Sequence, residues 1–124
     1  MLDPKYQYKL KAERYQAIFE KQKDSAKPST VLKLAQYWNK AGEPEKSLKA
    51  CQILQKLLQA NSDTKVLATY GEGLAKVYAE LNQSESAIKW FNVAIENTET
   101  PYQKDRIRNL MENFVKTQPS VSEK

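Results

Sequence analysis

The side chains that most often carry out catalysis or hold a metal are scarce in this chain of 124 residues. The sequence has no histidine, which removes the commonest general base and the commonest metal ligand. Its carboxylates show no spacing that would pair two of them in an apolar setting. The residue types therefore argue against an enzyme, and we expect no cofactor and no metal.

Two features that could carry chemistry have structural interpretations instead. The single cysteine, Cys51, has no second thiol, and it falls among leucines at helical spacing, which predicts a core position rather than a nucleophile. Gly71-Glu72-Gly73 is too short for a phosphate-binding loop and lacks the Gly-Lys-Ser/Thr that would follow one. Because these glycines interrupt a helical pattern, we favour close helix packing or a slight bend.

The composition favours helix almost throughout, with only three glycines and five prolines. No run approaches the roughly 18 apolar residues of a membrane span, and the opening residues lack the apolar stretch of a signal peptide. A single cysteine also fits a reducing compartment. We therefore expect a cytoplasmic protein with no transmembrane segment.

The net charge of +5 is unevenly distributed. Residues 1–66 carry +6, residues 67–101 carry −3 and residues 102–124 carry +2. A basic first part and an acidic second hairpin would attract differently charged partners. The alternative is that these charges are simply solvated helix faces rich in lysine.

Small, apolar and aromatic residues recur at a spacing of 40 positions. Leu34-Ala35 followed by Trp38 returns as Leu74-Ala75 followed by Tyr78. The second half of the same repeat follows this spacing too, with Ser47, Cys51 and Leu54 returning as Ala87, Phe91 and Ala94. A period of this size is typical of stacked helical hairpins, which usually bind another protein.

Apolar stripes at helical spacing, interrupted by turn-forming residues, predict six helices. The first runs from Pro4 to about Asp24, and the third from Pro44 to about Ala60. The second helix is expected to have its N-cap at Ser29 and to end at Gly42, in the left-handed region. The joint Asn61-Ser62-Asp63 precedes the fourth helix, which should end at Asn82. We expect the N-cap of the fifth helix at Ser84, and the capping box Thr100-Pro101-Tyr102-Gln103 at the start of the sixth. Residues 118–124 are expected to form a disordered tail.

This pattern resembles the tetratricopeptide repeat, which places Leu, a small residue and an aromatic on one helix and small–aromatic–small on the next. The resemblance implies an all-α, right-handed solenoid of about six antiparallel helices in one domain, residues 1–117. Two full hairpins would cover about 28–61 and 68–101, with an N-terminal helix before them and a capping helix at 101–117. Three departures stand out: a period longer than the usual length of about 34 residues, Gly71 in place of a bulky residue, and a closing proline that arrives only at Pro101.

The resemblance also implies a concave, partner-binding groove lined by the first helix of each hairpin. The peptide-carboxylate clamp of chaperone-binding members is not supported, because Leu32 and Gln36 stand where its Lys and Asn would lie. The predicted groove residues are Lys33, Gln36, Asn39, Lys40, Thr69, Glu72, Lys76 and Glu80. The alternative is that the polar side chains of these residues only face solvent.

We therefore expect a non-enzymatic protein–protein interaction module that binds a peptide or helix of a partner, as a scaffold, adaptor or assembly factor. One alternative is a self-associating or structural subunit that uses the N-terminal helix, residues 5–23. A third and weaker hypothesis is a basic surface for nucleic acid or an acidic membrane. Trp38 and Trp90 are predicted to be packed, the alternative being that Trp90 forms an exposed aromatic patch with Tyr15 and Tyr102.

Overall fold

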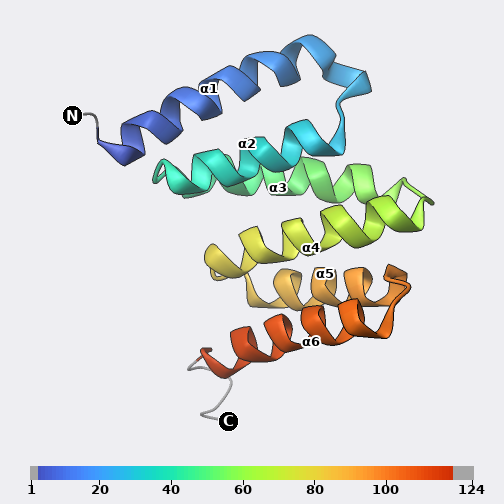
Figure 1. Cartoon of the computed structure of the whole chain (residues 1–124). Helices are drawn as coiled ribbons and strands as arrows, with labels where there is room; N and C mark the ends of the chain where they lie inside the picture. The colour runs from blue at the N-terminus through green and yellow to red at the C-terminus, as the bar shows by residue number, and fades with distance from the viewer. Residues whose placement is uncertain (1–2, 119–124) are drawn as a thin grey trace. The chain divides into compact units, whose positions relative to one another are not determined.

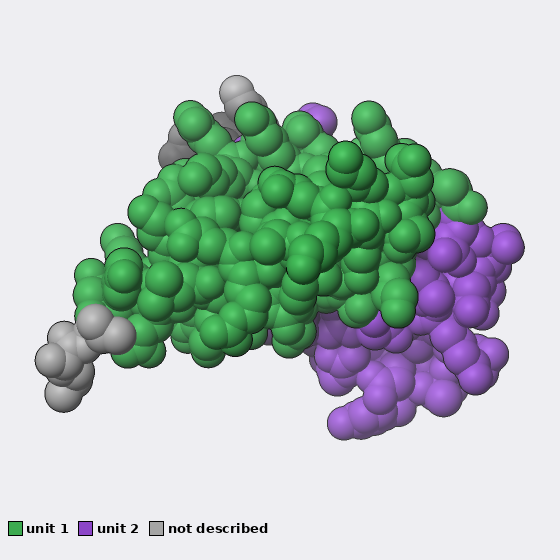
Figure 2. Space-filling view, turned by 90° about the horizontal axis from the view of Figure 1, so that it is seen from above, with its two compact units in different colours: residues 1–60 green, residues 61–124 purple. Residues whose placement is uncertain are grey.

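The computed structural model describes residues 3–118, which form six α-helices and one short 3₁₀ turn, without a strand. The prediction of an all-α protein is confirmed. Most of the predicted tail, residues 119–124, lies outside the described residues. The chain forms two compact units, Met1–Ala60 and Asn61–Lys124, which Figure 2 colours separately. The predictions of one domain over residues 1–117 and of a right-handed solenoid depend on how the two units are arranged, and both stay predictions.

Unit 1 consists of three α-helices in which the middle one contacts the other two. These are α1 (Pro4–Gln22), α2 (Pro28–Lys40) and α3 (Pro44–Gln59), with the 3₁₀ turn η1 (Lys23–Ser25) after α1. Neighbouring helices run in opposite directions (Figure 1). Because α1 buries only Ala12, most of the core comes from α2 and α3. That core consists of Val31, Leu34, Ala35, Trp38, Ala50, Cys51, Leu54 and Leu58.

Unit 2 repeats this plan with α4 (Thr64–Glu80), α5 (Ser84–Asn97) and α6 (Pro101–Lys116), and here α5 contacts both neighbours (Figure 1). The buried Gly71 of α4 faces α5, and a Cβ added to it would lie 3.7 Å from the Cβ of Ala94. Gly71 thus lies at the contact between α4 and α5, at a position with room for one methyl group. The core consists of Leu74, Ala75, Val77, Tyr78, Ala87, Trp90, Phe91, Ala94, Ile95 and Ile107.

Proline and short polar side chains begin several of these helices. The Asp3 carboxylate accepts a hydrogen bond from the Lys5 backbone N–H at 3.0 Å, and Asp63 does the same for Lys65 at 2.9 Å. The Thr100 hydroxyl accepts a hydrogen bond from the Gln103 N–H at 3.2 Å, which confirms the N-cap half of the predicted capping box, whereas the Gln103 side chain accepts from Arg106 Nε at 2.7 Å. Each N-cap side chain satisfies an amide that has no partner within its own helix.

Two predicted N-caps are wrong. Helix α2 begins at Pro28, since proline's fixed φ already suits the first helical position, so Lys27 is the N-cap and Ser29 lies inside the first turn. Helix α5 begins at Ser84 itself, with Gln83 as its N-cap. The Ser84 hydroxyl instead donates to the side-chain oxygen of Gln118 at 2.8 Å.

The two predicted helix-ending residues behave as expected. Gly42 has a φ of 79° and Asn82 a φ of 60°, both in the left-handed region. Glycine adopts this region freely, and asparagine tolerates it better than most residues. The chain can therefore reverse within a few residues and begin α3 and α5.

Candidate functional site

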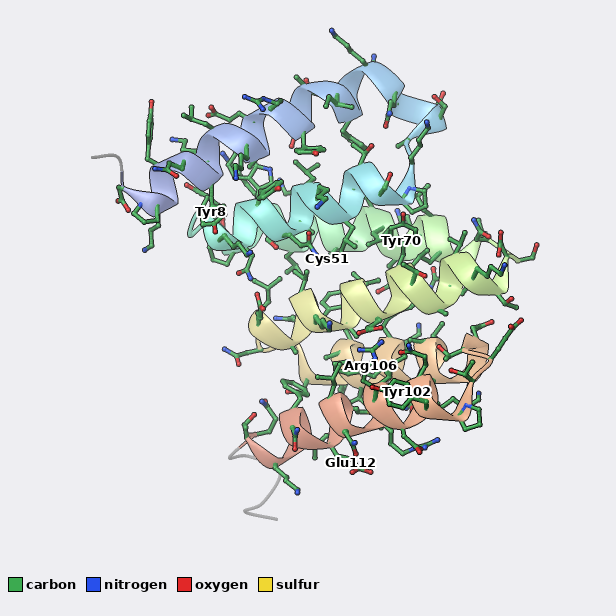
Figure 3. All side chains as sticks on the ribbon, in the orientation of Figure 1. Tyr8, Cys51, Tyr70, Tyr102, Arg106 and Glu112 are labelled. Atoms are coloured by element: carbon green, nitrogen blue, oxygen red, sulfur yellow. The ribbon has the colours of Figure 1, made fainter. Side chains whose placement is uncertain are left out.

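Three tyrosines and three lysines of unit 1 gather where α1 packs against α2. We call this group, Tyr8, Lys11, Tyr15, Lys33, Tyr37 and Lys40, the tyrosine–lysine surface. The Tyr37 ring lies between the other two rings, with centroids 6.1 Å from Tyr8 and 5.6 Å from Tyr15. Figure 3 labels Tyr8 on α1, on the side that faces α2. One pair is stacked and the other tilted, and aromatic pairs at such distances attract each other beyond their apolar burial.

The lysine amines of this surface lie over the tyrosine rings. Lys11 Nζ is 5.6 Å from the ring centroids of both Tyr8 and Tyr37. Lys40 Nζ is 5.2 Å from the Tyr8 centroid, and Lys33 Nζ is 6.0 Å from the Tyr37 centroid. These are cation–π distances, and each such contact is worth about 0.5–1 kcal/mol at an exposed site. The rings therefore favour a particular place for each ammonium group.

Within residues 3–118, no carboxylate lies within ion-pair distance of these three ammonium groups. None of the ion pairs between described residues includes Lys11, Lys33 or Lys40, and all three side chains are exposed. A tyrosine ring attracts a lysine ammonium group through its quadrupole but carries no negative charge that would neutralise it. The ammonium N–H groups can therefore still donate hydrogen bonds to an anion. The surface is thus a preformed group of cations that form no ion pair with the described residues.

Helical geometry explains why these six residues meet. Positions 8, 11 and 15 of α1, and positions 33, 37 and 40 of α2, are each separated by three or four residues and so share one face of their helix. Packing α1 against α2 brings the two faces together. Of the predicted groove residues, Lys33 and Lys40 belong to this surface, while Gln36 and Asn39 lie half-buried on the same helix.

The sequence analysis did not place Lys11 and the tyrosines in the site. The signal for them was present, because Tyr8 and Tyr15 lie seven positions apart with Lys11 between them on the same helical face. Both tyrosines are only half-buried, as is Tyr37, and so retain contact with solvent.

The predicted groove residues of unit 2 are engaged differently. Arg106 donates two parallel hydrogen bonds to the Glu72 carboxylate, each 2.8 Å long, and Lys76 Nζ lies 3.0 Å from the same carboxylate. Figure 3 labels Arg106 on α6. The bond from Arg106, aided by Lys76, lowers the pKa of Glu72 below its ordinary value of 4.5. Glu72 and Lys76 therefore serve the internal structure of unit 2.

An open pocket of about 320 Å³ lies beside this ion pair and includes Thr69, Glu72 and Arg106 in its lining. Thr69 and Glu80 are exposed on α4. Because the charges of Glu72 and Arg106 already satisfy each other, this pocket offers less to a charged ligand than the tyrosine–lysine surface does. A single groove formed by residues of both units stays a prediction.

Cys51 is fully buried, as predicted, and burial raises its pKa to about 12, so the thiol stays protonated. Residues 3–118 contain no group of three or more Cys, Asp or Glu side chains placed to hold a metal ion. None of the helices in the same range is long and apolar enough to cross a membrane.

Both tryptophans are packed, as predicted, with exposures of 4% for Trp38 and 2% for Trp90. The alternative of an aromatic patch that includes Trp90 is therefore wrong, although Tyr102, which Figure 3 labels on α6, is highly exposed.

No protein-family model matches this chain, and no curated protein or solved structure is significantly similar to it. Membership of the tetratricopeptide family accordingly stays a prediction. The class that the structure defines is the coarser one of an all-α protein.

Proposed function

We propose that this chain is a non-enzymatic protein-binding module whose tyrosine–lysine surface binds an acidic peptide or helix of a partner protein. The observation that carries the proposal is the arrangement of Lys11, Lys33 and Lys40 over tyrosine rings, with no ion pair to a carboxylate of the described residues. Such a module would act as a scaffold, an adaptor or an assembly factor.

Charge complementarity supports an acidic ligand. Residues 1–66 carry +6, and the three uncompensated ammonium groups lie within that part of the chain. Carboxylates spaced along a partner segment would gain charge-assisted hydrogen bonds from them. The half-buried tyrosines supply contact area with few rotatable bonds, which limits the entropy lost on binding.

The same geometry favours a protein segment over single-stranded nucleic acid. Nucleobases bind such surfaces by stacking on free aromatic faces. Here the Tyr37 ring is stacked with Tyr8 and in tilted contact with Tyr15, and Lys11 lies over two of the three rings. The surface also contains no arginine, which would read phosphates through paired hydrogen bonds.

Affinity capture from the native cell with matched variants tests the proposal. The variant carries Lys11→Glu, Lys33→Glu and Lys40→Glu, which reverse the three charges. Its control carries Lys9→Glu, Lys21→Glu and Lys56→Glu, which change the net charge equally at exposed positions outside the surface. We expect the partner to be retained by the wild type and the control and lost from the variant. Equal retention by all three would place binding elsewhere.

A second candidate is self-association through α1, favoured by one observation. Tyr6, Leu10 and Ile18 of this helix are large apolar residues that remain exposed. Light scattering across concentration would show a dimer that Leu10→Glu with Ile18→Glu abolishes. A wild type that stays monomeric at high concentration would exclude this candidate.

A further inference from the structure

Unit 1 has a second recess, distinct from the tyrosine–lysine surface, to which all three of its helices contribute. This pocket has a volume of about 280 Å³. Leu34 and Trp38 in its lining are buried, and Phe19 and Ile53 are half-buried. Its walls are therefore mainly apolar, with side chains contributed by α1, α2 and α3.

Two lysines of α3 complete this pocket. Lys46 and Lys49 are three positions apart, so they share one face of the helix, and both are exposed. Lys46 Nζ lies 4.4 Å from the Trp38 ring centroid, closer than any lysine–tyrosine distance in unit 1. No ion pair between described residues includes either lysine. The pocket thus combines an apolar wall with two lysines that form no ion pair with a described residue.

The orientation of Trp38 is fixed by its own polar atom. Its indole N–H donates to the side-chain oxygen of Gln16, at 3.4 Å, so the helices α1 and α2 both hold the ring. Lys46 lies over the same ring. The wall of the pocket is therefore formed before any ligand arrives, which reduces the cost of ordering on binding.

The size of the pocket limits what can occupy it. A cavity of about 150 Å³ lined by apolar side chains holds a benzene molecule, whereas drug-sized ligands use pockets of roughly 300–1,000 Å³. A pocket of about 280 Å³ falls just below that range and suits one large apolar side chain. The two lysines would attract carboxylates on the residues next to it.

We infer that this pocket accepts one Phe or Leu side chain of an acidic partner segment, whose neighbouring Asp or Glu carboxylates bind Lys46 and Lys49. The inference rests on the proposed function, since it concerns a protein ligand, but it assigns a separate surface and a sequence preference. The chemical signature of the ligand is a large apolar residue flanked by acidic residues.

Selection from a phage-displayed library of random 12-residue peptides on the intact chain tests this inference. We expect the enriched peptides to contain Phe or Leu beside Asp or Glu. Lys46→Glu with Lys49→Glu should weaken their binding by about tenfold or more, because each carboxylate then meets a like charge. Lys9→Glu with Lys21→Glu, an equal charge change outside the pocket, should leave binding unchanged.

A space-filling variant separates the apolar contact from the charges. Ala50 is buried and contributes to the pocket lining, so Ala50→Leu should occupy part of its volume and weaken the same peptides. Circular dichroism shows whether this variant still folds, and the lysine double variant does not depend on that result. Enriched peptides that lack a large apolar residue, or that bind the lysine double variant equally well, would overturn the inference.

The same selection distinguishes this inference from the proposed function. Peptides lost only from the variant with Lys11→Glu, Lys33→Glu and Lys40→Glu would support the tyrosine–lysine surface and overturn the pocket as a second site. A selection that enriches nothing on the wild type above the charge-reversed variants would contradict both.

Discussion

Gly42 and Asn82, which are 40 positions apart, occupy the same place in two turns of the same construction. Each has a positive φ, and the residue after each one donates its backbone N–H to the carbonyl of an aromatic residue near the end of the preceding helix. These bonds run from Glu43 to Trp38 and from Gln83 to Tyr78, both at 2.9 Å. The sequence period therefore corresponds to a repeated local structure in units 1 and 2.

Substitutions at these two residues should have opposite effects on stability. Gly42→Ala should lower the free energy of unfolding by about 1–2 kcal/mol, because a Cβ is strained in the left-handed region. Asn82→Gly should raise it by about 0.5 kcal/mol by removing the milder strain of asparagine. Thermal unfolding followed by circular dichroism measures both. A Gly42→Ala variant as stable as the wild type would contradict the turn geometry.

Replacing Gly71 with alanine should stabilise unit 2. The added Cβ would meet Ala94 and the Trp90 carbonyl oxygen at 3.7 Å, an ordinary contact distance. Alanine is favoured over glycine inside a helix by about 0.5–1 kcal/mol, and we expect a gain of that size. Gly71→Leu is the matched control, and it should destabilise because α5 leaves no room for a longer side chain. Destabilisation by alanine as well would show that the helices pack more closely than described.

The ion pair between Glu72 and Arg106 should make stability depend on pH. The folded pKa of Glu72 is lowered below 4.5, so the pair stabilises the folded state above that pH and loses its effect as the pH falls through the folded pKa. Because the Arg106 side chain is 40% exposed, we expect Glu72→Gln to cost only about 1 kcal/mol at pH 7. Thermal unfolding of both proteins should show this difference shrinking at acid pH. A difference that does not change with pH would mean that the charge is not its cause.

Cys51 should report on the opening of unit 1. Its side chain is fully buried and its pKa is raised to about 12, so a thiol reagent at pH 8 should label the folded protein very slowly. Labelling in increasing denaturant, with mass spectrometry as the readout, should become fast as the core of α2 and α3 unfolds. Rapid labelling of the native protein would show that this core is accessible.

Much of the local structure could be predicted from the sequence because single residues determine it. Pro4, Pro44 and Pro101 begin helices, Gly42 ends one, and Cys51 falls on an apolar stripe. The caps predicted at Ser29 and Ser84 were wrong, because the N-cap of α2 lies two residues earlier, at Lys27, and that of α5 one residue earlier, at Gln83. The spacing of residue types along the sequence does not determine a helix boundary to within one or two residues.

The candidate site was less accessible to sequence reasoning because it depends on contacts between helices. Lys33 and Lys40 could be found from their helical face, but their association with Lys11 requires the packing of α1 on α2. The role of Glu72 as a partner of Arg106 likewise depends on the rotation of α6, since 34 positions separate the two residues. Spacing along one helix carries no information about either contact.

The central claim is that the tyrosine–lysine surface binds an acidic protein segment, and the most direct measurement is calorimetric titration of the purified captured partner. The wild type and the control with Lys9→Glu, Lys21→Glu and Lys56→Glu should bind it equally. The variant with Lys11→Glu, Lys33→Glu and Lys40→Glu should bind at least about a hundredfold more weakly, and salt should weaken the wild type more than the variant. An affinity that is unchanged in this variant, or that is lost equally in the control, would contradict the account.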